Sequence, residues 1–140
     1  MSDEADPLAQ VTVTLPYGGS MTLADVVNAW ARRVARFQAE EHSSLDDPAT
    51  WGGHDYIGTL HWRSHVEAAI QQAPDELRDL MLERVGAVDK AFLSFTEPDT
   101  RGLVGRFANE QPPASGWWWW WQRLPRSGPA REEMDQVASP

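Results

Sequence analysis

Residues 57–95 read IGTLHWRSHVEAAIQQAPDELRDLMLERVGAVDKAFLSF, two amphipathic segments separated by a single proline, Pro74. Apolar residues recur in both segments at steps of three and four, which is the period of an α-helix with one buried face. The pattern predicts one helix over about 57–72 and another over about 74–95. Because only one or two residues separate them, the two helices are expected to fold back as an antiparallel hairpin.

A third helical pattern lies upstream, over about 23–41, with its arginines on the side away from an apolar stripe. Thr22 is a suitable N-cap for this helix, because its hydroxyl can accept a hydrogen bond from a backbone N–H of the first turn. Before it, residues 10–15 alternate β-branched side chains as a strand does, and a glycine-containing turn follows. The sequence therefore predicts a mainly α (α+β) fold with a three-helix body.

The chain after residue 95 is less regular. Residues 117–124 favour a strand, because tryptophan has a high β propensity and prolines bracket the segment. A small β element from residues 10–15 and 117–124 is therefore expected, and residues 103–107 are a candidate for another short strand. The chain is interpreted as a flexible N-terminal end (1–9), a single compact domain (10–125) and a polar C-terminal tail (126–140) in which residues 130–137 could form a short helix.

The composition excludes several classes of site. The net charge of −9, from 21 acidic and 12 basic residues, disfavours nucleic acid and anionic membrane surfaces and favours a basic partner. The absence of cysteine excludes disulfides, thiolate nucleophiles and cysteine-ligated metal centres. The first ten residues lack the features of a secretory signal, and no apolar run could span a bilayer, so a cytoplasmic protein is expected. Eleven arginines against one lysine are typical of a high-GC bacterial genome.

Five consecutive tryptophans occupy positions 117–121. Neighbouring side chains of a strand point to opposite faces, and those of a helix spread around its axis, so neither places all five on one face. Each tryptophan can bury about 150–250 Å², so three exposed ones would leave on the order of 500 Å² of apolar surface in water. Two arrangements remain open: a strand covered on both faces, or a strand docked on a partner protein or a sister subunit. For the second arrangement, the predicted interface residues are Trp117, Trp119 and Trp121.

His61 and His65 are the candidate metal ligands, since imidazoles at positions i and i+4 project from one face of a helix. The signal is weak, because Trp62 stands where the zinc-hydrolase motif has its catalytic glutamate and no third ligand is assigned. The serines lack a Gly-x-Ser-x-Gly elbow, and the glycine pair at 18–19 lacks the lysine of a phosphate loop. No catalytic residue and no cofactor is therefore predicted.

The function predicted from these features is non-enzymatic protein–protein interaction, of the immunity- or antitoxin-type kind that inhibits a basic partner. Carboxylates would attract the partner and tryptophans would anchor the interface. Two alternatives remain: a small metal- or ligand-binding enzyme that uses the helix face of His61 and His65, and a structural homo-oligomer joined through the tryptophan strand. Asp55, Tyr56 and Asp89 are expected to be buried polar groups that anchor the helical hairpin.

Overall fold

The computed structural model describes residues 6–109 and 118–138 of the 140-residue chain. These residues form a mainly helical α+β structure with two small antiparallel sheets, which confirms the fold class predicted from the sequence. In chain order the elements are the 3₁₀ helix η1 (Pro7–Gln10), strands β1 (Thr12–Thr14) and β2 (Ser20–Thr22), helices α1 (Leu23–Ala39), α2 (Gly53–Gln72) and α3 (Asp75–Phe95), strand β3 (Thr96–Pro98), helix α4 (Leu103–Ala108), the 3₁₀ helix η2 (Trp119–Gln122), strand β4 (Arg123–Pro125) and helix α5 (Pro129–Ala138).

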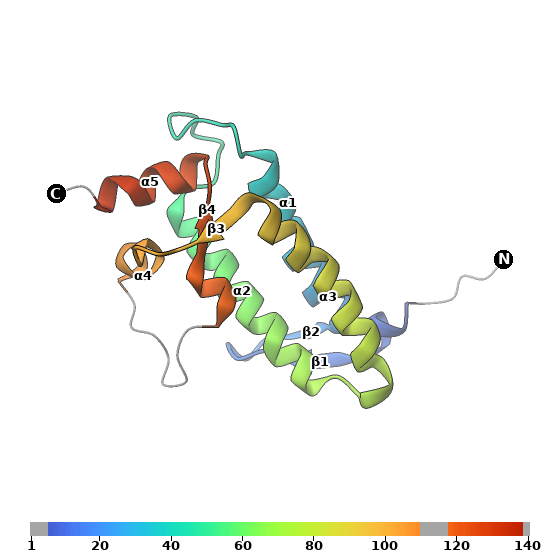
Figure 1. Cartoon of the computed structure of the whole chain (residues 1–140). Helices are drawn as coiled ribbons and strands as arrows, with labels where there is room; N and C mark the ends of the chain where they lie inside the picture. Colours follow the sequence, from blue (N-terminus) through green and yellow to red (C-terminus); the bar gives the residue numbers. More distant parts are fainter. Residues whose placement is uncertain (1–5, 110–117, 139–140) are drawn as a thin grey trace.

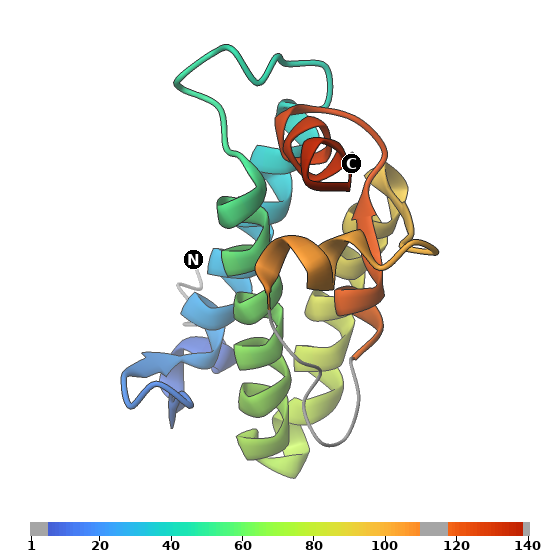
Figure 2. The same cartoon turned by 90° about the vertical axis from the view of Figure 1, so that its left-hand side faces the viewer.

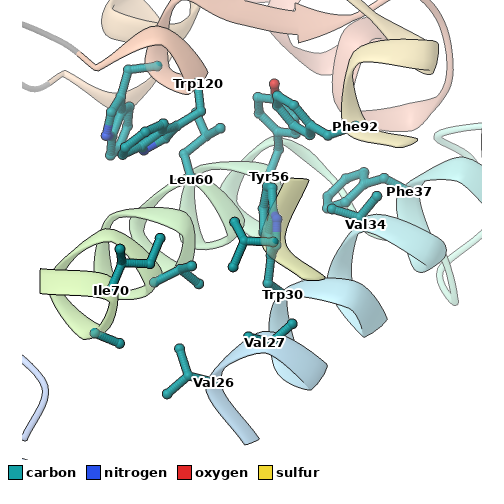
Figure 3. Packing of buried hydrophobic residues seen from close by; sticks show 14 of the residues in the cluster. Val26, Val27, Trp30, Val34, Phe37, Tyr56, Leu60, Ile70, Phe92 and Trp120 are labelled. Atoms are coloured by element: carbon teal, nitrogen blue, oxygen red, sulfur yellow. The ribbon is translucent and has the colours of Figure 1, made fainter. Parts of the chain in front are cut away.

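Helices α1, α2 and α3 form the body of the molecule, with α4, α5 and the β3–β4 sheet at one end (Figure 1). A tight turn reverses the chain after α2, so α2 and α3 run antiparallel, and α1 packs against both (Figure 2). The apolar stripe of α1, which includes Trp30 and Phe37, is buried with Leu60 of α2 and Phe92 of α3 (Figure 3). Full burial of such a side chain contributes about 1.5–3 kcal/mol to folding. Within the described ranges, no helix has both the length and the apolar character needed to cross a bilayer.

Two helices of the body begin at identifiable caps. The Thr22 hydroxyl accepts a hydrogen bond from the Asp25 N–H at 3.1 Å, as predicted for α1. Helix α2 begins four residues before the predicted start, at Gly53, because two carboxylates satisfy its first N–H groups. Asp55 accepts from the N–H preceding Gly53 at 3.0 Å, and Glu133 of α5 accepts from the Gly53 N–H at 2.6 Å. Both negative charges lie at the positive end of the helix dipole. Asp55 is exposed rather than buried.

A polar contact at the centre of the body joins all three long helices. The Asp89 carboxylate of α3 accepts hydrogen bonds from Arg63 of α2, at 2.9 Å from Nε and 2.9 Å from Nη2. It also accepts one from the indole of Trp30 on α1 at 3.0 Å. Only 5% of the Arg63 side chain and 16% of the Asp89 side chain are exposed. The prediction that Asp89 anchors the hairpin is confirmed, and fully buried Tyr56 donates its hydroxyl to the Arg123 carbonyl at 2.7 Å.

The strands form two separate two-stranded sheets. β1 pairs with β2 in a hairpin, with Val13 opposite Met21, and β4 pairs with β3, which directly follows α3. Gly18 closes the hairpin with a φ of +97°, a conformation that L side chains rarely adopt. The segments 10–15 and 117–124, which were expected to supply a small β element, therefore contribute strands to two different sheets. Pairing β1 with a strand a few residues further along the chain costs less loop-closure entropy than pairing it with a strand about a hundred residues away.

The segments at both ends of the predicted domain belong to the fold. Helix α5 packs against α4 and α2 and buries Ala130 and Met134, which corrects the predicted polar tail at 126–140. Residues 103–107, a candidate strand, lie in helix α4 instead. At the other end, Leu8 of η1 is fully buried although it falls in the predicted flexible segment, whose residues 1–5 lie outside the described ranges.

Candidate functional site

The tryptophan segment does not form the predicted strand. Residues Trp119–Gln122 form the 3₁₀ helix η2, in which the Trp121 N–H donates to the Trp118 carbonyl at 3.0 Å. Strand β4 begins only at Arg123. A 3₁₀ helix has about three residues per turn, so successive side chains diverge by about 120°. Neighbouring tryptophans therefore point to different sides of the segment.

Trp120 and Trp121 are part of the core. Their side chains are 1% and 5% exposed, and both indole N–H groups donate to the Ser64 hydroxyl of α2, at 3.0 and 3.2 Å. The guanidinium carbon of Arg63 lies 4.3 Å from the centre of the Trp120 ring. A buried indole needs a hydrogen-bond acceptor, and Ser64 supplies one to both rings. Sequence reasoning missed this role of Ser64, because the serine lies far away in the chain and in no recognisable motif.

Trp118 and Trp119 remain on the surface, with exposed fractions of 41% and 39%. Both rings rest on buried Trp120. The ring centroid of Trp118 is 5.1 Å away in a stacked arrangement, and that of Trp119 is 5.5 Å away in an edge-to-face arrangement. The two exposed rings are therefore supported from below, and a partner would have little side-chain motion to restrict when it binds them.

The outer face of α3 continues the surface beside Trp119. Leu93 is 41% exposed and lines, together with Trp119, an open cleft of about 400 Å³. Leu82, 47% exposed, lies eleven residues earlier, which is three helical turns and therefore the same side of α3. The exposed carboxylates of Asp75 and Asp79 precede Leu82 by seven and three residues, about two turns and one turn, so they lie on the same side of α3. We call the surface formed by these five residues the α3–Trp face.

Of the three predicted interface residues, Trp119 is the one that is described and exposed. Trp117 lies outside the described residues. Trp121 is buried, so its prediction as an interface residue is wrong. Its backbone lies in a 3₁₀ turn and not in a strand, and the turn directs its side chain into the core. Leu82 and Leu93 were missed. In the helix predicted over 74–95, both leucines lie away from the face on which apolar residues recur at steps of three and four. These two apolar residues on the opposite face were the signal that could have found them.

His61 and His65 lie one turn apart on α2, as predicted, and both rings take part in aromatic packing. The His61 ring meets Trp121 edge-to-face with centroids 4.8 Å apart. The His65 ring contacts Tyr17 at 5.3 Å and Trp62 at 5.5 Å. In the part of the chain that the structure describes, no group of three or more histidine, aspartate or glutamate side chains could hold a metal ion.

His65 is expected to make the stability of the protein depend on pH. Its Nδ1 is buried and has no hydrogen-bond partner among the described residues, and burial lowers its pKa from the usual 6.5, with a smaller contribution from His61. The unfolded chain therefore binds this proton more readily than the folded one, so the free energy of unfolding decreases as the pH falls below 6.5. Urea denaturation between about pH 7.5 and about pH 5.5 measures this decrease. A His65→Gln variant should show a shallower pH dependence, and an unchanged slope would contradict the assignment.

Comparison of the chain with protein-family models, with curated proteins and with solved structures finds no match. The function is therefore inferred from the contacts, exposure and charge of the residues themselves.

Proposed function

We propose that this protein is a non-enzymatic interaction domain that binds a basic partner protein through the α3–Trp face. The observation that carries the proposal is the exposure of Trp119 beside Leu93, whereas Trp120 and Trp121 are buried. Exposed aromatic residues in well-packed positions dominate the binding energy of many interfaces. Trp119 also lies 5.7 Å from the guanidinium carbon of Arg63, so its ring is held on two sides.

The distribution of charge supports a basic partner. The chain has a net charge of −9, and the first nine residues of α3 include four carboxylates, Asp75, Glu76, Asp79 and Glu83, against one arginine, Arg78, which pairs with Asp75 at 2.9 Å. Carboxylates around an apolar patch accelerate association with a positively charged protein, and salt screens this attraction. An immunity- or antitoxin-type inhibitor of a basic enzyme, acting in the cytoplasm, is the class that best fits this combination of features.

Self-association through the same face is less favourable than binding a basic protein. A symmetric dimer would bring together two copies of a chain whose net charge is −9, with the exposed Asp79 carboxylate on the joined face of each. Like charges placed together at an interface oppose its formation. A partner that places lysine or arginine opposite these carboxylates adds attraction to the interface, whereas a second copy of this chain adds repulsion.

Variants of the α3–Trp face test the proposal. Immobilised wild-type protein and immobilised Leu93→Asp are each exposed to an extract of the source cells. The partner is the protein that binds the wild type and does not bind Leu93→Asp, and it is then purified. Trp119→Ala is expected to weaken the affinity for this purified partner by about thirtyfold to a hundredfold, because truncating an aromatic anchor removes about 2–3 kcal/mol. Isothermal titration calorimetry measures the Kd, and rising salt concentration should weaken binding further.

Tyr17→Ser is the matched control, because Tyr17 is 59% exposed but lies in the β1–β2 turn, outside the α3–Trp face. This variant should bind the partner as the wild type does. Circular dichroism verifies that Leu93→Asp is folded, as expected for a side chain at the surface. The proposal is refuted if Trp119→Ala, which plays no part in isolating the partner, binds the purified partner with wild-type affinity. It is also refuted if light scattering shows a dimer that Leu93→Asp dissociates, since the face would then join two copies of the chain.

A further inference from the structure

A second surface, with the opposite charge, lies where α1 meets the segment that leads into α2. An open cavity of about 450 Å³ is lined there by Ala29, Arg32, Arg33, Arg36, Trp51 and Trp62. We call it the arginine cavity. Three positive charges at one site are unexpected in a chain whose net charge is −9. The volume falls within the range of about 300–1,000 Å³ that is usual for small-molecule sites.

The walls of the arginine cavity are fixed by contacts with the rest of the fold. The Glu40 carboxylate accepts hydrogen bonds from Arg36 Nε and from the Trp51 backbone N–H, each at 2.8 Å. The Trp51 ring packs edge-to-face on Phe37 with centroids 5.5 Å apart. The Trp62 indole N–H donates to a carbonyl oxygen of α1 at 3.1 Å. Both aromatic walls are therefore in place before any ligand arrives, which lowers the entropic cost of binding.

Arg32 and Arg33 carry charge that the fold leaves unbalanced. Arg33 donates to a neutral threonine hydroxyl of α2 at 3.2 Å, and Arg32 is exposed. Neither forms an ion pair with another residue of the described ranges, whereas Arg36 has its carboxylate partner. The guanidinium carbons of Arg33 and Arg36 lie 5.6 and 4.9 Å from the centre of the Trp51 ring. A guanidinium held against an aromatic ring still has N–H groups at its edge that can bind anionic oxygens.

We propose that the arginine cavity binds a small organic anion that carries both a flat ring and a phosphate or carboxylate group. The guanidinium groups of Arg32 and Arg33 pair with the anionic oxygens, and a planar guanidinium does so in bidentate geometry. Trp51 and Trp62 provide apolar surface for the ring. An inorganic anion would not contact the two indoles through a ring, and a neutral ring would not pair with the guanidinium groups of Arg32 and Arg33. The cavity shares no residue with the α3–Trp face, so this proposal does not depend on the partner protein.

Calorimetric titration of the full chain with four probes tests the proposal. AMP and phthalate combine a ring with anionic groups, adenosine provides a ring without the phosphate, and inorganic phosphate provides the charge alone. We expect AMP or phthalate to bind at least about tenfold more tightly than adenosine and inorganic phosphate, since charge-assisted hydrogen bonds add to ring packing. Whichever of AMP and phthalate binds more tightly shows whether the cavity prefers a nucleotide or an aromatic acid. In an NMR spectrum, the bound probe should shift the indole N–H signal of Trp51, assigned with Trp51→Phe, and leave that of Trp118 unchanged.

Three variants locate the binding. Arg32→Gln should weaken it about fivefold to tenfold, because it removes an unpaired charge without breaking an internal contact. Arg101→Gln is the matched control: Arg101 is also exposed, and it does not line the cavity. Ala29→Phe keeps every charge but occupies part of the cavity, and it should abolish binding.

Each of the following results would overturn the proposal. Neither AMP nor phthalate binds with a Kd below about 5 mM. Adenosine or inorganic phosphate binds as tightly as the ring-bearing anions, which would show that the ring and the charge are not recognised together. Arg101→Gln weakens binding as much as Arg32→Gln, which would assign the affinity to the overall charge of the protein instead of to this cavity.

Discussion

Replacing Asp89 by alanine is expected to lower the free energy of unfolding by about 3 kcal/mol, because the buried charge of Arg63 loses its closer carboxylate and keeps only the longer contact to Glu67. The Arg63 guanidinium remains 5% exposed and loses the two 2.9 Å hydrogen bonds that neutralise it. The Trp30 indole loses its acceptor as well. Domains of this size are stable by about 5–15 kcal/mol, so the variant should approach the limit of folding at room temperature. Urea denaturation followed by circular dichroism measures the loss.

Glu67→Gln is the matched control for this prediction. Glu67 is 28% exposed and accepts a 3.3 Å hydrogen bond from the same Arg63 guanidinium, so its loss should cost less than about 1 kcal/mol. The double variant Arg63→Met, Asp89→Leu removes both charges and should recover most of the stability lost in Asp89→Ala. A loss below about 1 kcal/mol in Asp89→Ala would show that this ion pair does not hold the three helices together.

Trp120→Ala is expected to lower the free energy of unfolding by about 3–5 kcal/mol, the usual cost of emptying a buried aromatic site. The Trp120 side chain is 1% exposed, donates to Ser64 and packs against the Arg63 guanidinium. Its removal leaves a cavity beside the central ion pair. It also removes the ring that supports Trp118 and Trp119, so affinity for a partner should fall together with stability.

Trp118→Ala is the comparison within the same run of tryptophans. Its side chain is 41% exposed, so the same chemical change should cost less than about 1.5 kcal/mol in the same denaturation experiment. Trp120→Phe keeps a ring in the core but removes the N–H that reaches Ser64, and it should fall between the two. Equal losses for Trp118→Ala and Trp120→Ala would contradict the division of the run into two buried and two exposed side chains.

The candidate site was only partly predictable from the sequence. The composition and spacing of the tryptophans showed that they cannot all lie on one face, and the structure divides the four described ones between core and surface. The direction of each ring depends on whether the backbone is extended or a 3₁₀ turn. That choice is made by contacts with Ser64 and Arg63, which lie more than fifty residues away in the chain. The role of Asp89 was predicted, but its partner Arg63 was not, because arginine in a helical pattern usually lies at the surface.

The order of residues is sufficient to predict the three long helices, the N-cap at Thr22 and the hairpin formed by α2 and α3. These features depend on the period of apolar residues and on contacts between near neighbours, both of which are present in the order of residues. Three features become clear only in the folded protein: which strands pair, the packing of α5 on the body, and which tryptophans reach the surface. These outcomes depend on free-energy differences between long-range contacts. The tryptophan run shows both kinds of information. Its sequence shows that the five side chains cannot all lie on one face, and the hydrogen bonds to Ser64 place Trp120 and Trp121 in the core.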